Sequence, residues 1–234
     1  MSHEVEMRMQ AANFRKQHGF GANEPIRLTS LLMKLNVITF FREIDDKISG
    51  MSIKINENRF ILINSLKSIG RQHFTICHEL YHLYFEKEFE KNICYAETKR
   101  KRTDTEIRAD LFASYLLLPE EGIIELIPDD EKKTNKIKLA TLIKIEQYYS
   151  CSRAGLLTAL KRMKYIDSKA YEKYRIGVIT DAKKLGYTTE LYEKGNDGKI
   201  IGDYGEKARR LYDAEKISEQ HYLNILMDAR IEKN

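Results

Sequence analysis

Hydrophobic positions along the chain repeat in two different ways, and the alternation between them predicts a mixed α and β fold. Repeats close to 3.6 residues predict helices, and short runs rich in Val, Ile and Phe predict strands. The predicted helices cover residues 3–18, 25–36, 68–88, 103–118, 136–149, 152–163, 206–215 and 218–230. The predicted strands cover residues 37–41, 50–55 and 59–64, and the last two are joined by turn residues 56–58 as a hairpin.

The order of these segments predicts three regions. Residues 1–127 contain the predicted strands and a long helix, and we expect them to form an α+β domain with a small sheet. Residues 128–168 begin with a polar linker at 128–133 and continue as two helices resembling a helix-turn-helix. Residues 169–234 predict a helical and β-hairpin region of unknown role, with the hairpin formed by 188–192 and 199–201 around a Gly-rich turn.

The composition narrows the class of protein. The chain has 234 residues, 42% of them hydrophobic and 32% charged, with a net charge of +5, which is mild for this length and does not require nucleic acid as a partner. No apolar run is long enough for a transmembrane helix, and the first residues lack the apolar segment of a secretion signal. Three widely spaced cysteines are typical of reduced thiols, so we expect a cytoplasmic protein without membrane contact. The basic run at 99–102 lies in a predicted polar loop at 90–102 and is either solvated or a docking patch for an acidic partner.

The most informative chemistry is the motif H-E-x-x-H formed by His78, Glu79 and His82. On a helix the two histidines lie one turn apart on one face, where they can bind one Zn²⁺, while Glu79 can take a proton from a metal-bound water whose pKa falls to about 7. Two ordinary helix histidines are the alternative. The uninterrupted helical pattern around the motif favours the metal site and indicates a zinc hydrolase, most often a peptidase.

A catalytic zinc needs a third protein ligand, and the best candidate is Glu106 on the next predicted helix. Asp110 follows at i+4, so both carboxylates face the same way, and Asp110 can accept the remaining N–H of a ligand histidine. Thr103 and Glu106 also form a capping-box pattern, so from the pattern alone Glu106 is either a ligand or a helix-start residue. The same ligands also accept Mn²⁺, Fe²⁺ or Co²⁺ in place of Zn²⁺.

Two motifs together give the chain a recognisable pattern. Arg71-x-x-Phe-Thr-x-x-His-Glu-x-x-His82 is followed by Glu106-x-x-Ala-Asp-x-Phe-Ala113-x-x-Leu-Leu-Leu-Pro119. This pattern resembles the ImmA/IrrE family of metallopeptidases, with Tyr81 at a position where that family often has Gly. The resemblance implies a zincin-like fold, zinc ligands at His78, His82 and Glu106, and a catalytic base at Glu79.

The resemblance also implies a function. Members of this family typically cleave a helix-turn-helix (Xre-type) transcriptional repressor and so relieve repression in a mobile-element or stress response. Two alternatives remain: a non-catalytic binding module acting as an anti-repressor or antitoxin, and a DNA-binding regulator. The helix pair at 136–164 carries Ser152, Arg153, Lys161, Arg162 and Lys164 and could contact DNA, but its charges gather late in the second helix, which favours a scaffold or substrate-docking role. The oligomeric state is not predicted.

Overall fold

Five strands form one mixed sheet within the part of the chain that the computed structural model describes, residues 2–86, 91–95, 103–134 and 136–229. The strands are β1 (Val37–Arg42), β2 (Ile48–Ile55), β3 (Asn58–Asn64), β4 (Lys91–Tyr95) and β5 (Ile200–Ile201), in the spatial order β4-β2-β3-β1-β5. The predicted hairpin of β2 and β3 is present, β1 lies parallel to β3, and β4 and β5 pair antiparallel at the two edges. The α+β class predicted from the sequence is confirmed.

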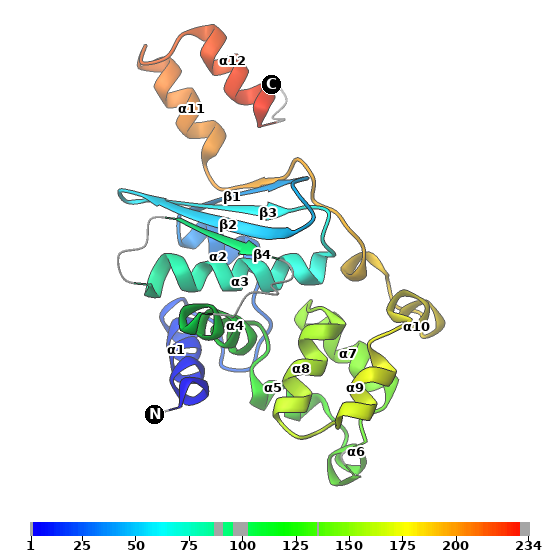
Figure 1. The fold of residues 1–234 in the computed structure, drawn as a ribbon. Helices are drawn as coiled ribbons and strands as arrows, with labels where there is room; N and C mark the ends of the chain where they lie inside the picture. Colours follow the sequence, from blue (N-terminus) through cyan, green and yellow to red (C-terminus); the bar gives the residue numbers. More distant parts are fainter. Residues whose placement is uncertain (1, 87–90, 96–102, 135, 230–234) are drawn as a thin grey trace.

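The sheet separates two groups of helices (Figure 1). Helix α3 (Ile69–Phe85) runs along one face, and α11 (Tyr204–Asp213) and α12 (Glu219–Asp228) lie on the other side. The side chains of Ile61 and Ile63 on β3 lie in the core, and both are fully buried. At Gly50 of β2 an added Cβ would lie 2.7 Å from the Thr75 side chain, so the absence of a side chain allows α3 to approach the sheet closely.

An aromatic cluster joins α3 to the helices beneath it, α1 (His3–Gln17) and α4 (Asp104–Leu117). Phe112 of α4 lies 5.7 Å from Phe14 of α1 and 5.0 Å from Phe85 of α3, measured between ring centroids. Tyr81 packs into the same cluster, 5.7 Å from Phe112 and 5.8 Å from Phe85. The cluster fixes α4 against α3, which is the pair of helices that carries the predicted metal ligands.

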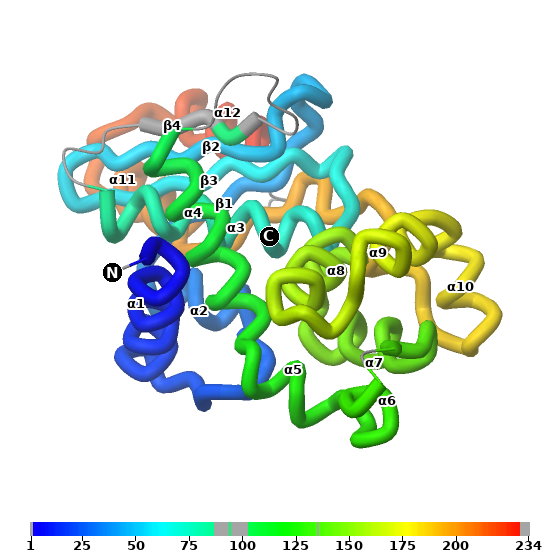
Figure 2. The backbone as a smooth tube through the Cα atoms, turned by 60° about the horizontal axis from the view of Figure 1, so that its bottom comes forward, coloured from blue at the N-terminus to red at the C-terminus, as the bar shows by residue number. Residues whose placement is uncertain are grey.

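Helices α5 to α10 form a second group beside the start of α3. They are α5 (Glu120–Leu126), α6 (Asp129–Thr134), α7 (Leu139–Tyr149), α8 (Arg153–Arg162), α9 (Ser168–Tyr174) and α10 (Val178–Lys184). Two views place α7–α10 together and away from α1 (Figures 1 and 2). The short α2 (Leu28–Lys34) precedes β1. None of the described helices is both long and apolar enough to cross a bilayer.

Three predictions of local structure are wrong. Part of the predicted loop at 90–102 is the edge strand β4, because its backbone pairs with β2; the basic run at 99–102 lies outside the described residues. The predicted linker at 128–133 is helix α6, whose buried Glu131 accepts hydrogen bonds from Lys138 N and Thr141 Oγ1 at the start of α7. The predicted hairpin at 188–201 is absent, because residues 190–192 form a 3₁₀ turn, η1 (Glu190–Tyr192), and β5 pairs with β1.

Candidate metal centre

Helix α3 carries three polar side chains of the H-E-x-x-H motif in its buried stretch. His78, Glu79 and His82 are 2%, 0% and 1% exposed, values that are rare for polar residues unless they have a specific partner. The spacing of four residues places both imidazoles on the face that packs against α4. The Nε2 atoms of the two rings lie 3.2 Å apart.

Helix α4 brings Glu106 to these two nitrogens. Its carboxylate oxygens lie 3.3 Å from Nε2 of His78 and 3.4 Å from Nε2 of His82. The backbone N–H of Glu106 donates to Thr103 Oγ1 over 3.3 Å, so the Thr103 half of the predicted capping box is present. The two interpretations of Glu106 are therefore compatible: its backbone takes part in the cap and its carboxylate faces the histidines.

The separations between these donor atoms suit a divalent metal ion. Donors bound tetrahedrally at about 2.0–2.1 Å lie roughly 3.3–3.4 Å from one another. The three separations of 3.2, 3.3 and 3.4 Å match that spacing. Two imidazole nitrogens and a carboxylate fit Zn²⁺ and also accept Mn²⁺, Fe²⁺ or Co²⁺.

A second carboxylate holds each histidine through its other nitrogen. Nδ1 of His78 lies 3.0 Å from Asp110 Oδ1, and Nδ1 of His82 lies 2.6 Å from Glu86 Oε2. Burial alone would lower the pKa of His78, but its hydrogen bonds, foremost the one that it donates to Asp110, raise that pKa well above the usual value. Burial and the neighbouring charge of His78 lower the pKa of His82. The carboxylates thus orient Nε2 of both rings toward the same point.

Glu79 lies between this cluster and the sheet. Ser52 of β2 donates a hydrogen bond of 2.5 Å to Oε2, while Oε1 is buried and has no hydrogen-bond partner among the described residues. Burial raises the pKa of Glu79 to about 7, against the opposing effects of His78 and the Ser52 hydroxyl. A carboxyl group with a pKa near neutrality can both take up and release a proton.

Sequence reasoning missed Ser52 and Glu86 around these groups, and it interpreted Cys94 as an ordinary thiol instead of a metal ligand. Ser52 and Cys94 come from strands, and the donor atoms of Cys94, His78 and Glu79 lie within 4.8 Å of one another. No spacing rule connects these strand positions to the motif, because only the folded sheet brings them close. Glu86 could have been found, since it follows His82 by four residues at the end of the predicted helix.

Comparison with protein families bears on the same residues. The model of the IrrE N-terminal-like domain matches residues 32–161, more than half of the chain. The chain belongs to this family. It is a metallopeptidase-type family, and the matched segment contains His78, Glu79, His82, Glu106 and Asp110. No curated protein sequence matches the chain.

The segment that matches the IrrE-like family also includes α7 and all but the last residue of α8, the helix-turn-helix-like pair. α7 and α8 meet at a sharp corner where Ser150 adopts a left-handed φ of 52°. Arg153, at the start of α8, is 3% exposed and forms a buried ion pair with Glu146 of α7. A guanidinium held in this way is not available to contact a DNA base.

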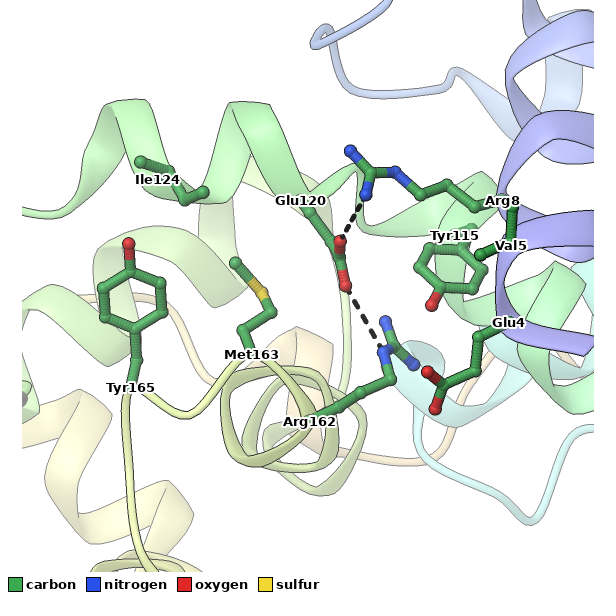
Figure 3. Close-up of a pocket in the computed structure, with 9 residues that line it drawn as sticks. All are labelled: Glu4, Val5, Arg8, Tyr115, Glu120, Ile124, Arg162, Met163 and Tyr165. Carbon is green, nitrogen blue, oxygen red and sulfur yellow. Dashed lines mark hydrogen bonds and ion pairs between the residues drawn. The ribbon is translucent and has the colours of Figure 1, made fainter. Parts of the chain in front are cut away.

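The last turn of α8 also makes internal contacts. Arg162 lies 3.4 Å from Glu120 of α5, which Arg8 of α1 reaches from the other side over the same distance (Figure 3). The guanidinium of Arg162 also stacks on Tyr115, 4.2 Å from the centroid of its ring. The four residues line a pocket of about 390 Å³. Because Arg162 is engaged in contacts within the protein, we favour a scaffold role for α8 over DNA recognition.

Proposed function

We propose that this protein is a metal-dependent endopeptidase in which Glu79 is the catalytic base. The observation that supports this most directly is the convergence of His78, His82 and Glu106 beside a buried carboxylate that has one unpartnered oxygen. A pure binding module has no need of an acid–base group at that place. Membership of the IrrE-like family supports the same reaction class.

In the proposed reaction, His78, His82 and Glu106 hold the metal ion. The bound metal would acidify a water molecule and polarise the peptide carbonyl. Glu79 takes one proton of the attacking water at Oε1 and returns it to the nitrogen of the leaving amine, so that water and peptide become a carboxylic acid and an amine. Ser52 keeps the Glu79 side chain in place by its hydrogen bond to Oε2.

The proposed substrate is a helix-turn-helix transcriptional repressor, whose cleavage relieves repression in a mobile-element or stress response. This substrate class rests on the resemblance to the ImmA/IrrE family. The internal contacts of Arg153 and Arg162 support a protein substrate over DNA, because they engage the basic side chains that the helix pair would use on a duplex.

The test measures metal binding and peptide cleavage separately. We expect Glu79→Gln to keep about one metal ion per chain, measured by mass spectrometry, because its side chain lies outside the three-donor set. Cleavage of a helix-turn-helix repressor should fall by about 10²–10⁴-fold. Glu106→Ala should lose both the metal and cleavage.

The matched control is Glu57→Gln, the same chemical change at an exposed turn residue between β2 and β3. It should leave the metal content and cleavage unchanged. Normal cleavage by Glu79→Gln would remove Glu79 as the base. Repressor release that survives Glu79→Gln without any cleavage would instead establish a non-catalytic binding module.

A further inference from the structure

Cys94 lies on the edge strand β4, and the sheet directs its side chain toward helix α3. It pairs with Gly50 of β2, and residues that pair across two strands point to the same face of the sheet. An added Cβ at Gly50 would meet the Thr75 side chain, so this is the face that α3 covers. His78 and Glu79 follow Thr75 by three and four residues, one turn further along the helix. Cys94 therefore enters the metal centre from the sheet.

The thiol of Cys94 lies among the groups of the metal centre. Its Sγ, a ring nitrogen of His78 and a carboxylate oxygen of Glu79 lie within 4.8 Å of one another. The thiol and the His78 ring also interact directly. All three side chains are buried, and Cys94 is 6% exposed. These atoms form a second set of candidate metal donors, which shares His78 with the set formed by His78, His82 and Glu106.

The free oxygen of Glu79 is an independent sign that a group is missing at this place. Ser52 donates to Oε2 only, and Oε1 has no hydrogen-bond partner within the part of the chain that the structure describes. Glu79 is fully buried, and buried polar atoms normally have a partner. A fully buried oxygen left unpaired beside the donor atoms of Cys94 and His78 indicates a site that is filled when the metal ion binds.

The three ligands from α3 and α4 leave one position of a tetrahedral metal ion open. Zn²⁺ binds four ligands, and a cysteine thiolate is one of its preferred donors. A thiolate and an imidazole nitrogen on the same zinc ion lie about 3.6 Å apart. The sulfur of Cys94 and a ring nitrogen of His78 are at most 4.8 Å apart, so a small movement of the side chain brings the sulfur to a bonding position.

We propose that Cys94 is a fourth ligand of the metal ion and raises the preference of the site for Zn²⁺ over Mn²⁺. This inference rests on the proposed metal site of His78, His82 and Glu106. When the sulfur binds, the thiol loses its proton to the solvent. A thiolate is a soft ligand that favours Zn²⁺, whereas carboxylate and water also suit Mn²⁺. The four-ligand site is closed, so a substrate must displace the thiolate before cleavage.

The experiment uses the full chain loaded with Co²⁺ in a buffer without added thiols. A thiolate bound to Co²⁺ gives a charge-transfer absorption in the near ultraviolet, which nitrogen and oxygen ligands do not give. We expect the wild type to bind about one Co²⁺ per chain and to show this band. Cys94→Ala should bind Co²⁺ without the band. Co²⁺ bound by the wild type without the band would overturn the proposal and leave the three-ligand site intact.

The matched control is Cys151→Ala, the same change at a buried cysteine in the corner between α7 and α8. It should keep the band. Cys94→Ser preserves the size of the side chain and should also lose the band, which covers the case that Cys94→Ala does not fold. Circular dichroism shows which variants are folded. A band that persists in folded Cys94→Ser would overturn the assignment to Cys94.

The preference for Zn²⁺ is measured by competition with a metal chelator. We expect Cys94→Ala to weaken Zn²⁺ binding by at least about tenfold and Mn²⁺ binding by less than about threefold. Equal losses for the two ions would overturn the role of Cys94 in metal selection. Failure of the proposed metal site gives a different result, because the wild type would then bind neither Co²⁺ nor Zn²⁺. All of these readouts are independent of peptidase activity.

Discussion

The histidines of the metal centre are each held at Nδ1 by a carboxylate, and the two carboxylates come from different helices. Asp110 belongs to α4, whereas Glu86 directly follows α3, the helix of His82. A hydrogen bond at Nδ1 fixes the ring orientation and keeps Nε2 free to bind the metal. Asp110 therefore couples the orientation of His78 to the packing of α4 on α3.

We predict that Asp110→Asn weakens metal binding by about 10–100-fold without unfolding the protein, because an amide orients His78 less strongly than a carboxylate. Competition with a metal chelator measures the change in Kd. Asp104→Asn makes the same substitution at an exposed position of α4, where the side chain is 62% exposed. An Asp110→Asn protein with the Kd of Asp104→Asn would show that Asp110 does not support the metal site.

The sequence predicted the site only where the spacing along a helix determines which side chains meet. His78 and His82, and likewise Glu106 and Asp110, are pairs at i and i+4, and the structure brings all four together. Ser52 reaches Glu79 from 27 positions away through the close contact of β2 with α3. Such a contact depends on how the sheet and the helix pack, which no local pattern encodes.

At the scale of elements, α3 joins the sheet, α4 and the corner between α7 and α8. Its first turn packs closely against the backbone of that corner, since a Cβ at Gly70 would lie 2.7 Å from the nitrogen of Ser152 and 2.9 Å from the carbonyl carbon of Cys151. Backbone atoms cannot move aside as a flexible side chain can. His73 adds a hydrogen bond of 2.7 Å to the carbonyl of Ser150 at the same corner.

We predict that Gly70→Ala lowers the free energy of unfolding by about 1–3 kcal/mol. Alanine favours a helix over glycine by up to about 1 kcal/mol, but the new Cβ forces α3 away from the α7–α8 corner. Urea unfolding measures the difference. Gly195→Ala is the control, because its Cβ would meet Ile69 at an ordinary 3.4 Å. An unchanged midpoint in Gly70→Ala would mean that this corner moves aside easily.

Short elements escaped prediction because tertiary contacts stabilise them. α6 has the composition of a linker, and it is fixed by Glu131, 3% exposed, at the start of α7. β4 is an edge strand of five residues whose backbone bonds to β2. The long segments with clear periodicity, α1, α3 and α4, begin and end within about three residues of their predicted limits.

At the scale of the whole molecule, the C-terminal part of the chain returns to the domain formed by the first half. β5 extends the sheet at β1, and the Gln72 side chain of α3 donates to the Gly195 carbonyl over 3.0 Å. Tyr192 donates a hydrogen bond of 2.7 Å to Glu146. The ion pair between Glu146 and Arg153 thus lies where α7, α8, α10 and η1 meet.

We predict that Arg153→Met lowers the free energy of unfolding by about 3–5 kcal/mol at neutral pH, because it leaves the fully buried Glu146 carboxylate without its cation. Arg153→Met combined with Glu146→Leu removes both charges and should recover most of that loss. Arg175→Met, at an exposed arginine, should stay within about 0.5 kcal/mol of the wild type. Urea unfolding of the four proteins measures these differences.

The loss of stability in Arg153→Met should depend on pH, because it involves the titration of Glu146. Burial raises the pKa of Glu146 in the folded protein even beside Arg153, and removal of the arginine raises it further. The folded variant therefore binds a proton at a pH where the unfolded chain does not, so its stability relative to the wild type increases as the pH falls. We expect the deficit of Arg153→Met to be smaller at about pH 5 than at neutral pH. A deficit that is independent of pH would point to lost packing of the Arg153 side chain instead of an uncompensated buried charge.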